Sequence, residues 1–207
     1  HGVYAQLLEA IREDSRYISD DVVRKTRAFA GARLYCILER VACKRSDALI
    51  AITPREKELM VGRYDIDPRK IFVIPNGVDS RESDDLAKRS SGTIADKYER
   101  PLVLFVGRLS GVKGIPQLLR AWQVVKSKGV RGTLLVVGKV ESTSMPLFSG
   151  GVQDTVHILQ NVPREELMAL YSSADIFVLP SLFEGLPYTL LDALSFGKAC
   201  LVSNRLD

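Results

Sequence analysis

The sequence predicts an α/β fold built from open, doubly wound parallel sheets. Short apolar runs rich in Val, Ile and Leu recur along the chain without strict alternation of apolar and polar residues. Such runs are typical of strands that are buried on both faces, as in a parallel sheet. Helical patterns lie between the runs, and this alternation of strand and helix indicates βαβ units.

The expected elements follow from this alternation. Strands are expected at 48–53, 70–77, 102–107, 133–138, 155–159, 175–181 and 199–204. Helices are expected at about 22–46, 54–64, 114–129, 163–173 and 187–196. The 207-residue chain is 46% hydrophobic and 26% charged, which is the composition of an ordinary globular protein.

A polar segment divides the predicted elements into two groups. Residues 79–100 are rich in Ser, Asp, Lys and Arg, and we interpret them as a linker. Residues 1–78 are then the C-terminal part of a first domain, and residues 101–207 form a second, Rossmann-like domain. The chain opens on His1 and stops at Asp207 just after an apolar run. We therefore expect a piece of a longer protein, in which both domains are cut short.

Composition excludes several classes of function. The net charge of +4 is spread thinly over both halves, so nucleic acid is not an indicated partner. This excess is compatible with weak attraction to anionic lipid headgroups. No apolar run approaches the ~18 residues of a membrane-spanning helix. The three cysteines form no CxxC pair, which fits a reducing compartment.

Recognised catalytic motifs are also missing. The sequence holds no cluster of His, Cys, Asp and Glu with metal-ligand spacing, and no GxSxG or GxxxxGK[ST] motif. A GxGxxG fingerprint is absent too, which weighs against an NAD enzyme. His157 lies inside a predicted strand, and we interpret it as structural.

Arg108 and Lys113 form the first candidate site. They follow the predicted strand 102–107, and ligands in open α/β sheets lie beyond the carboxyl ends of strands. Gly114 precedes a helix whose N-terminus favours an anion, so this loop is suited to a phosphate. The competing interpretation is two solvated loop cations, the common fate of Arg and Lys.

Glu184 and Asp192 form the second candidate site. The turn Phe-Glu-Gly-Leu-Pro follows a buried strand and opens the helix that carries Asp192. Free N–H groups around Gly185 suit a phosphate, while carboxylates accept hydrogen bonds from sugar hydroxyls. Alternatively, Glu184 is a helix N-terminal acid and Asp192 faces solvent. Asn76 ends a strand in a Pro-Asn-Gly turn, and it either borders a cleft or belongs to a plain turn.

These motifs, taken in order, resemble those of the retaining glycosyltransferases of family 4. The resemblance rests on SDALIAIT, DPRKIFVIPNGVD, FVGRLSGVKG, ELMALYSSADIFVLPS and EGLPYTLLDALSFGKACLVSN, and it covers about residues 47–204. It implies the GT-B fold, in which two Rossmann-like domains face each other across a cleft. It also implies an enzyme that uses a nucleotide-sugar donor.

The resemblance assigns roles to individual residues. Arg108 and Lys113 would hold the donor diphosphate together with Gly185 and Leu186, and Glu184 would contact the donor sugar near the reacting carbon. The second acid of the family's E-x7-E motif binds the ribose, and in this chain it is Asp192, one methylene shorter. His1, followed by Gly2, resembles the family's acceptor-domain histidine, which faces the donor sugar. Thr53 and Asn76 fall at positions that border the cleft.

The implied reaction is metal-independent transfer of a sugar with retention of anomeric configuration. The donor would be a UDP-, GDP- or ADP-sugar, with no further cofactor, and the acceptor a glycan or a lipid-linked glycan. A cytoplasmic protein is expected, with peripheral association at the cytoplasmic membrane face as an option. One alternative to an active enzyme stays open, a catalytically inactive nucleotide-sugar-binding subunit of a glycosyltransferase complex. An epimerase on the same fold would need extra acid and base groups, and these are not found in the sequence.

Overall fold

The computed structural model describes residues 22–79, 81, 85–86, 88, 94–139 and 153–204. The candidate residue His1 lies outside these ranges. The chain divides into two compact units, each described below by itself. The first unit comprises residues 1–76, 183–186 and 205–207, and the second comprises residues 77–182 and 187–204.

The described residues of the first unit form a pair of short parallel strands with two helices. Its elements are α2 (Val22–Arg45), β1 (Leu49–Ala51), α3 (Pro54–Tyr64), the 3₁₀ turn η2 (Pro68–Lys70) and β2 (Ile71–Val73). β1 and β2 pair in parallel with Leu49 opposite Ile71. A small core of buried side chains joins the helices to the strands: Cys43, Ala51, Met60, Tyr64, Ile66 and Ile71.

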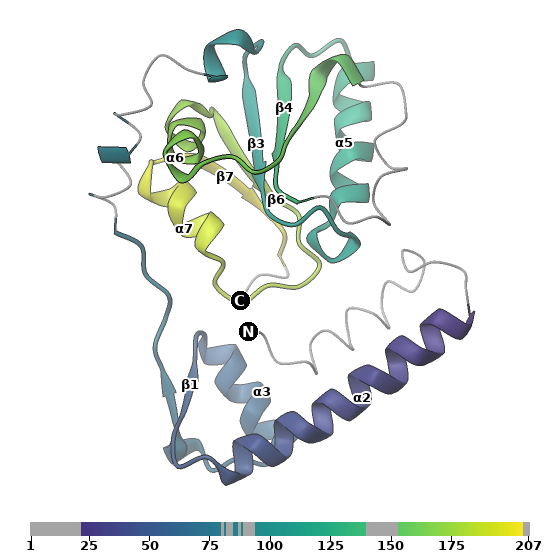
Figure 1. Ribbon diagram of the computed structural model, residues 1–207, viewed down its shortest axis with the longest axis vertical. Coiled ribbons are helices and arrows are strands. Elements are labelled where there is room, and N and C mark those ends of the chain that lie inside the picture. Colours follow the sequence, from purple (N-terminus) through teal and green to yellow (C-terminus); the bar gives the residue numbers. More distant parts are fainter. Residues whose placement is uncertain are drawn as a thin grey trace. The chain divides into compact units, whose positions relative to one another are not determined.

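The second unit is a five-stranded, entirely parallel sheet (Figure 1). Its strands are β3 (Leu102–Val106), β4 (Thr133–Val137), β5 (Val156–Leu159), β6 (Ile176–Leu179) and β7 (Ala199–Val202). Its helices are α5 (Ile115–Ser127), α6 (Arg164–Ser173) and α7 (Tyr188–Ser195). The spatial order of the strands is β5-β4-β3-β6-β7, the doubly wound order of Rossmann-like domains. In Figure 1, α5 lies on one side of the sheet and α6 and α7 lie on the other.

The predicted burial of every strand on both faces is only partly correct. All five residues of β4 are buried, because β4 has a neighbouring strand on each side. β5 is half-buried and β7 is largely exposed, since both are edge strands with a single partner. Leu201 in β7 is 66% exposed. An apolar run therefore identifies a strand in this chain but does not say whether it is central.

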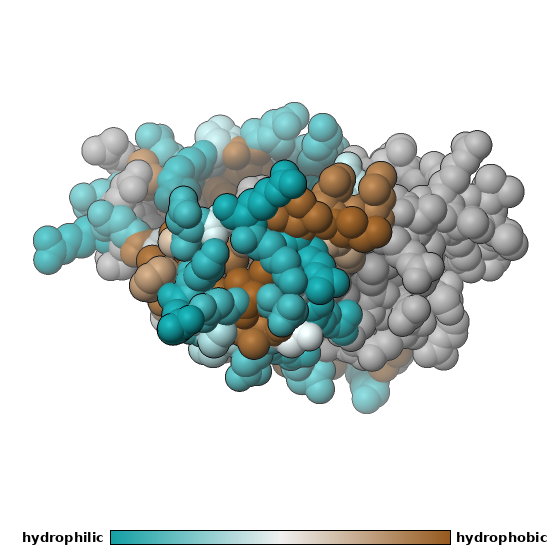
Figure 2. Space-filling model, turned by 90° about the horizontal axis from the view of Figure 1, so that it is seen from below, coloured by the Kyte–Doolittle hydropathy of each residue, from teal (hydrophilic) through white to brown (hydrophobic). Residues whose placement is uncertain are grey.

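Apolar side chains also reach the surface elsewhere. In the first unit they include Leu34, Ile37, Leu38 and Val41 on α2, with Ile50 and Phe72 on the strands. Figure 2 shows brown apolar patches among teal hydrophilic residues on the face seen from below. In the part of the chain that the structure describes, no helix combines the length and apolar character needed to cross a membrane.

The segment interpreted as a linker contains ordered structure of its own. The 3₁₀ turn η3 (Ile94–Lys97) lies within it, and the Ala95 side chain is buried. Two ion-paired residues fix the chain that follows. Glu99 Oε1 accepts from Arg131 Nε at 2.6 Å, and Arg100 donates to Asp175 at 2.7 Å. The chain that leads into β3 is therefore tied to neighbouring segments at Glu99 and at Arg100.

Candidate functional site

The two loops that carry the candidate motifs follow neighbouring strands at the point where the strand order reverses. β3 pairs with β4 on one side and with β6 on the other, and these neighbours lead to the two halves of the sheet. In open α/β sheets the ligand crevice lies outside the carboxyl ends of the strands at this switch point. Arg108 and Lys113 follow β3, and the 180–187 turn follows β6.

The loop after β3 is short and tightly hydrogen-bonded. Gly107 and Leu109 donate to the carbonyls of Val137 and Lys139, each at 2.9 Å, so the loop continues along β4. Leu109 is fully buried and anchors it. The 3₁₀ turn η4 (Gly111–Lys113) then leads into α5. Arg108 is exposed and Lys113 is half-buried on this fixed backbone.

The loop after β6 packs directly against this turn. Leu182 N donates to Val112 O at 2.9 Å. Gly114 is left-handed, with φ of 72°, and a Cβ built on it would lie 2.0 Å from the carbonyl oxygen of Pro180. Only glycine permits both the conformation and the close approach. The loop after β3 and the start of the loop after β6, at Pro180 and Leu182, are therefore joined within the second unit by backbone contacts.

Replacing Gly114 by Ala should disrupt this junction. The left-handed conformation alone costs a non-glycine residue about 1–2 kcal/mol, and the clash with Pro180 adds to that. We expect a free energy of unfolding lower by at least ~2 kcal/mol in urea titrations. Gly111→Ala is a matched control in the same loop, because its Cβ would meet nothing within 4 Å. Equal stability of the two variants would contradict this account.

Asp192 is buried on α7, so its interpretation as a solvent-facing helix residue is wrong. The residue is 7% exposed, and its Oδ1 is buried without a hydrogen-bond partner. Burial raises the pKa of the Asp192 carboxyl, while the positive charge of Arg164 opposes this shift. A buried, unpartnered carboxylate oxygen is costly and calls for an explanation, which a bound hydroxyl donor would supply.

Tyr171 on α6 is a second buried group that the sequence did not single out. Its hydroxyl is also without a partner, and its ring stacks on Phe196 with centroids 6.2 Å apart. Burial, followed by the charge of Asp192, raises the pKa of Tyr171. The sequence marks Tyr171 only as an apolar-face residue of a helix, so no pattern could have associated it with Asp192.

Glu184, Gly185 and Leu186 are half-buried and belong to the first unit. Within that unit Asn76 Nδ2 donates to Leu186 O at 2.7 Å. Asn76 is thus more than a plain turn residue, because its side chain fixes the backbone of this segment. A Cβ on Gly185 would approach Ile52 Cδ1 to 2.8 Å, which leaves little room for a larger residue.

Thr53 has a local structural task. It is buried, and its hydroxyl accepts from Glu56 N at 3.0 Å as the N-cap of α3. Glu56 in turn accepts from Ile52 N at 2.7 Å, which resembles a capping box. Among the residues that the structure describes, no group of three His, Cys, Asp or Glu side chains is placed to hold a metal ion.

Family models match both parts of the chain. The model described as "Glycosyl transferases group 1" matches residues 88–206, more than half of the chain. The chain belongs to the glycosyl transferases group 1 family. A second model, "Glycosyltransferase Family 4", matches residues 20–82. This family assignment confirms the resemblance that the sequence motifs indicated.

Individual relatives of this group 1 chain are distant. It is 28% identical over 181 residues to the UDP-Gal:alpha-D-GlcNAc-diphosphoundecaprenol alpha-1,3-galactosyltransferase of Escherichia coli, covering 83% of this chain and 46% of the relative. It is 27% identical over 206 residues to a D-inositol 3-phosphate glycosyltransferase of Corynebacterium aurimucosum, covering 93% and 47%. The chain spans about half the length of the curated relatives it matches.

Solved structures of glycosyltransferases share the fold. WaaG, a glycosyltransferase involved in lipopolysaccharide biosynthesis, superposes with a TM-score of 0.71 at 21% identity, covering 100% of this chain and 55% of that one. HepE from Anabaena, in complex with UDP-glucose, gives a TM-score of 0.67 at 16% identity, covering 83% and 49%. These likenesses confirm the predicted GT-B fold class.

Proposed function

We propose that the protein containing this chain transfers a sugar from a nucleoside diphosphate sugar to an acceptor. The observation that carries the proposal is the junction of the β3 and β6 loops at the switch point of the sheet, where Leu182 N bonds to Val112 O. A phosphate-bearing ligand is expected at this position in doubly wound sheets. Membership of the group 1 family supports sugar transfer as the reaction.

Arg108 and Lys113 are proposed to bind the donor diphosphate. Paired cations stabilise a phosphate by charge-assisted hydrogen bonds, and a helix N-terminus adds free N–H groups. α5 begins directly after Lys113 and Gly114, and α7 begins after the turn that holds Gly185 and Leu186. As the bond to the sugar breaks, negative charge develops on the leaving diphosphate, and these groups would stabilise it.

Glu184 and Asp192 are proposed to recognise the two sugar rings of the donor. Ionised carboxylates only accept hydrogen bonds, so each suits a hydroxyl-bearing ligand. The buried, unpartnered Oδ1 of Asp192 supports the proposal that this residue binds the ribose. Glu184 would orient the transferred sugar, with Asn76 and Thr53 at the border of the cleft. His1 is proposed to face the donor sugar from the acceptor domain.

Retention of configuration and independence of metal are proposed from the family resemblance. Cationic side chains and helix N-termini would then neutralise the leaving group where other enzymes use a bound metal. Addition of EDTA should therefore leave the rate of transfer unchanged. Proton NMR of the first-formed product would show whether its anomeric configuration matches that of the donor.

A UDP-sugar is the first donor to test, followed by GDP- and ADP-sugars. The Escherichia coli relative is named for UDP-Gal and for a diphosphoundecaprenol acceptor, and HepE was solved with UDP-glucose. We accordingly propose a glycan or lipid-linked glycan acceptor, with the enzyme in the cytoplasm and peripherally bound to the membrane that holds such a lipid. Vesicle co-sedimentation with and without anionic lipid tests that location.

The decisive experiment is a screen of the intact protein for hydrolysis and transfer with UDP-, GDP- and ADP-sugars. Turnover of at least one donor is the expected result. Tight binding of a nucleotide sugar without any turnover would instead favour the inactive binding subunit. Failure to bind any of the three nucleotides would overturn the proposal.

Lys113→Ala should weaken binding of the matching nucleoside diphosphate by at least ~1.5 kcal/mol, or more than tenfold, the lower range for a charge-assisted contact. Isothermal titration calorimetry measures this directly. Lys128→Ala, which removes an exposed lysine just beyond the other end of α5, is the control and should leave affinity unchanged. Unchanged affinity in Lys113→Ala would remove this residue from the diphosphate site.

A further inference from the structure

Two buried polar groups without hydrogen-bond partners lie on the packed helices α6 and α7. Among the residues that the structure describes, the buried side-chain atoms without a partner are Gln117 Oε1, Tyr171 Oη and Asp192 Oδ1. Gln117 belongs to α5, on one side of the sheet, whereas Tyr171 on α6 and Asp192 on α7 lie on the other side (Figure 1). Buried polar groups are nearly always hydrogen-bonded in native proteins, so two exceptions on packed helices call for a common explanation.

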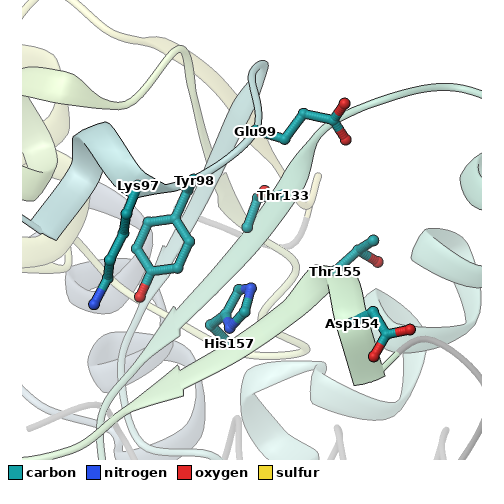
Figure 3. Close-up of a pocket in the computed structure, with 7 residues that line it drawn as sticks. All are labelled: Lys97, Tyr98, Glu99, Thr133, Asp154, Thr155 and His157. Atoms are coloured by element: carbon teal, nitrogen blue, oxygen red, sulfur yellow. The ribbon is translucent and has the colours of Figure 1, made fainter.

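A surface pocket at the amino ends of β4 and β5 shows the usual arrangement. There the Tyr98 ring lies between the side chains of Lys97 and His157 (Figure 3), and the Tyr98 and His157 ring centroids are 4.7 Å apart. Thr155 Oγ1 accepts from Trp122 Nε1 at 3.1 Å. His157 thus makes the kind of structural contact that its place in a strand predicts. Tyr171 and Asp192 differ from this pocket because their polar atoms have no such partners.

Ring contacts place Tyr171 against the face of α7 that carries Asp192. Phe196 N donates to Asp192 O at 3.2 Å, so these two residues lie one helical turn apart on the same face. The Phe196 ring stacks on the Tyr171 ring, with centroids 6.2 Å apart and planes inclined at 8°. The Phe177 ring of β6 also contacts Tyr171, at 5.8 Å between centroids. Packing therefore fixes the Tyr171 ring, and with it the direction of its Cζ–Oη bond.

The charges around Tyr171 keep its hydroxyl a donor. Burial, and after it the negative charge of Asp192, raises the pKa of Tyr171, so the hydroxyl keeps its proton at neutral pH. Cys200 on β7 acts in the same direction, and Arg164 on α6 opposes it. Burial also raises the pKa of the Cys200 thiol, and the Arg164 guanidinium stays charged. Asp192 is therefore the group of these four whose charge changes between about pH 4 and pH 8.

The Asp192 carboxylate can accept hydrogen bonds from two sides. An ionised carboxylate offers about four acceptor positions on its two oxygens. A ribose hydroxyl outside the domain could take one of them, but it cannot reach Tyr171, which is fully buried. The inner positions of the carboxylate need a donor from within the protein. A buried tyrosine hydroxyl usually has a partner, whereas Phe would suffice for packing alone.

We propose that Tyr171 is a positioning residue for Asp192, supplying the inner hydrogen bond to its carboxylate directly or through one internal water molecule. Hydrogen bonds of a ligand-free site are often long and tighten when the ligand binds, and internal water commonly joins buried polar groups. Either link favours the ionised carboxylate and offsets part of the cost of burying it. The consequence for ribose recognition rests on the function proposed above, whereas the link itself does not.

Tyr171→Phe tests the link, because it removes the hydroxyl and keeps the ring. Removing a buried hydroxyl that has no partner would leave stability unchanged or raise it. If the hydroxyl bonds to the ionised Asp192, we expect a lower urea midpoint for the intact variant at pH 7 than for wild type. The link holds the pKa of Asp192 in the folded state below that of the variant, so this loss should disappear below both values. In an Asp192→Asn background the loss should no longer depend on pH.

Calorimetry with UDP tests the positioning role. Tyr171→Phe should weaken UDP binding about fivefold, because the carboxylate that meets the ribose is held less firmly. The double variant with Asp192→Asn should bind UDP no more weakly than Asp192→Asn alone, since Tyr171 acts through Asp192. A crystal structure of the intact protein with UDP distinguishes a direct bond from a bridging water. Both atoms still unpaired in that complex would overturn the proposal.

Tyr64→Phe is the matched control. Tyr64 is a buried tyrosine of the first unit whose hydroxyl donates to the Glu39 carboxylate. This variant should also lose stability, but it should leave UDP affinity unchanged and should not couple to Asp192→Asn.

Three results in Tyr171→Phe would contradict the link or the role. They are stability at pH 7 equal to or above that of wild type, a stability loss that is the same at every pH, and unchanged UDP affinity. If the intact protein binds none of UDP, GDP and ADP, the proposed function fails, while the urea experiment still decides whether Tyr171 and Asp192 are linked.

Discussion

Glu184→Gln is expected to lower the turnover number by about 10²-fold or more while nucleoside diphosphate affinity stays nearly constant. The substitution keeps the shape of the side chain and removes its charge. If the carboxylate orients the transferred sugar, its loss misplaces the reacting carbon, and a small misplacement typically costs about 10²-fold in rate. The nucleotide is held by other groups, so its dissociation constant should not move. Initial rates with the preferred donor and calorimetry with the diphosphate measure the two quantities.

Three outcomes would change the role of Glu184. Equal losses in turnover and in diphosphate affinity would reassign it to the nucleotide. An unchanged rate would make it a spectator. A glycosyl adduct on Glu184 in intact-protein mass spectra would make it a nucleophile. Glu165→Gln, an exposed acid in the first turn of α6, is the matched control and should change neither quantity.

The element pattern was accessible from the sequence because each apolar run is bounded by turn residues or polar segments. The helix expected at 54–64 is observed as Pro54–Tyr64, and the strand expected at 133–138 as Thr133–Val137. The helix expected from residue 187 begins at Tyr188, because Pro187 adopts an extended conformation as its N-cap. Periodicity therefore places elements well but cannot fix their terminal residues, which depend on capping geometry.

Burial was less accessible, since it depends on what packs beside an element. VHIL and ACLV are as apolar as TLLVV, yet β5 and β7 lie at the sheet edges and β4 lies inside. For Asp192 the error is the opposite one, because an interpretation as a solvent-facing residue met a buried side chain. A carboxylate beside an apolar helix face is usually solvated, and only the packing of α7 shows that this one is buried.

In the candidate site, too, some features could be predicted from the sequence and others could not. The loop after β3 and the turn after β6 were predicted from strand ends and glycines, and the strand order places both at the switch point. The hydrogen bond from Asn76 to Leu186 joins positions 110 residues apart, and no local pattern could have indicated it. Tyr98 and His157 likewise come from separate elements, so only the fold brings their rings together.

Asp192→Asn is expected to raise stability at neutral pH and to lower nucleotide affinity. The wild-type carboxyl has a raised pKa in the folded state because it is buried, and its ordinary pKa in the unfolded chain. Between these two values the folded protein binds more protons than the unfolded one. Stability therefore falls as pH rises through that window, and the loss is complete above the folded-state pKa. The neutral Asn side chain has no such titration.

Urea unfolding between pH 3.5 and pH 8 would reveal this difference. The Asn variant should be the more stable protein at pH 7, and its advantage should disappear at the acidic end. Glu58→Gln, which neutralises an exposed acid on α3, should leave the pH profile of stability unchanged. A variant less stable than wild type at pH 7 would mean that the Asp192 carboxylate gains more from its surroundings than burial costs it.

The same substitution should weaken binding of the nucleoside diphosphate by about tenfold or more, because the hydrogen bond from a ribose hydroxyl would lose its charged acceptor. A 2′-deoxynucleoside diphosphate separates this effect from a general loss of affinity. Wild type should discriminate against the deoxy form, and Asp192→Asn should discriminate less. Greater stability together with poorer binding would indicate that the protein keeps a destabilising buried carboxylate because it recognises the ribose. Unchanged affinity and unchanged discrimination would remove Asp192 from the nucleotide site and leave its burial without a functional reason.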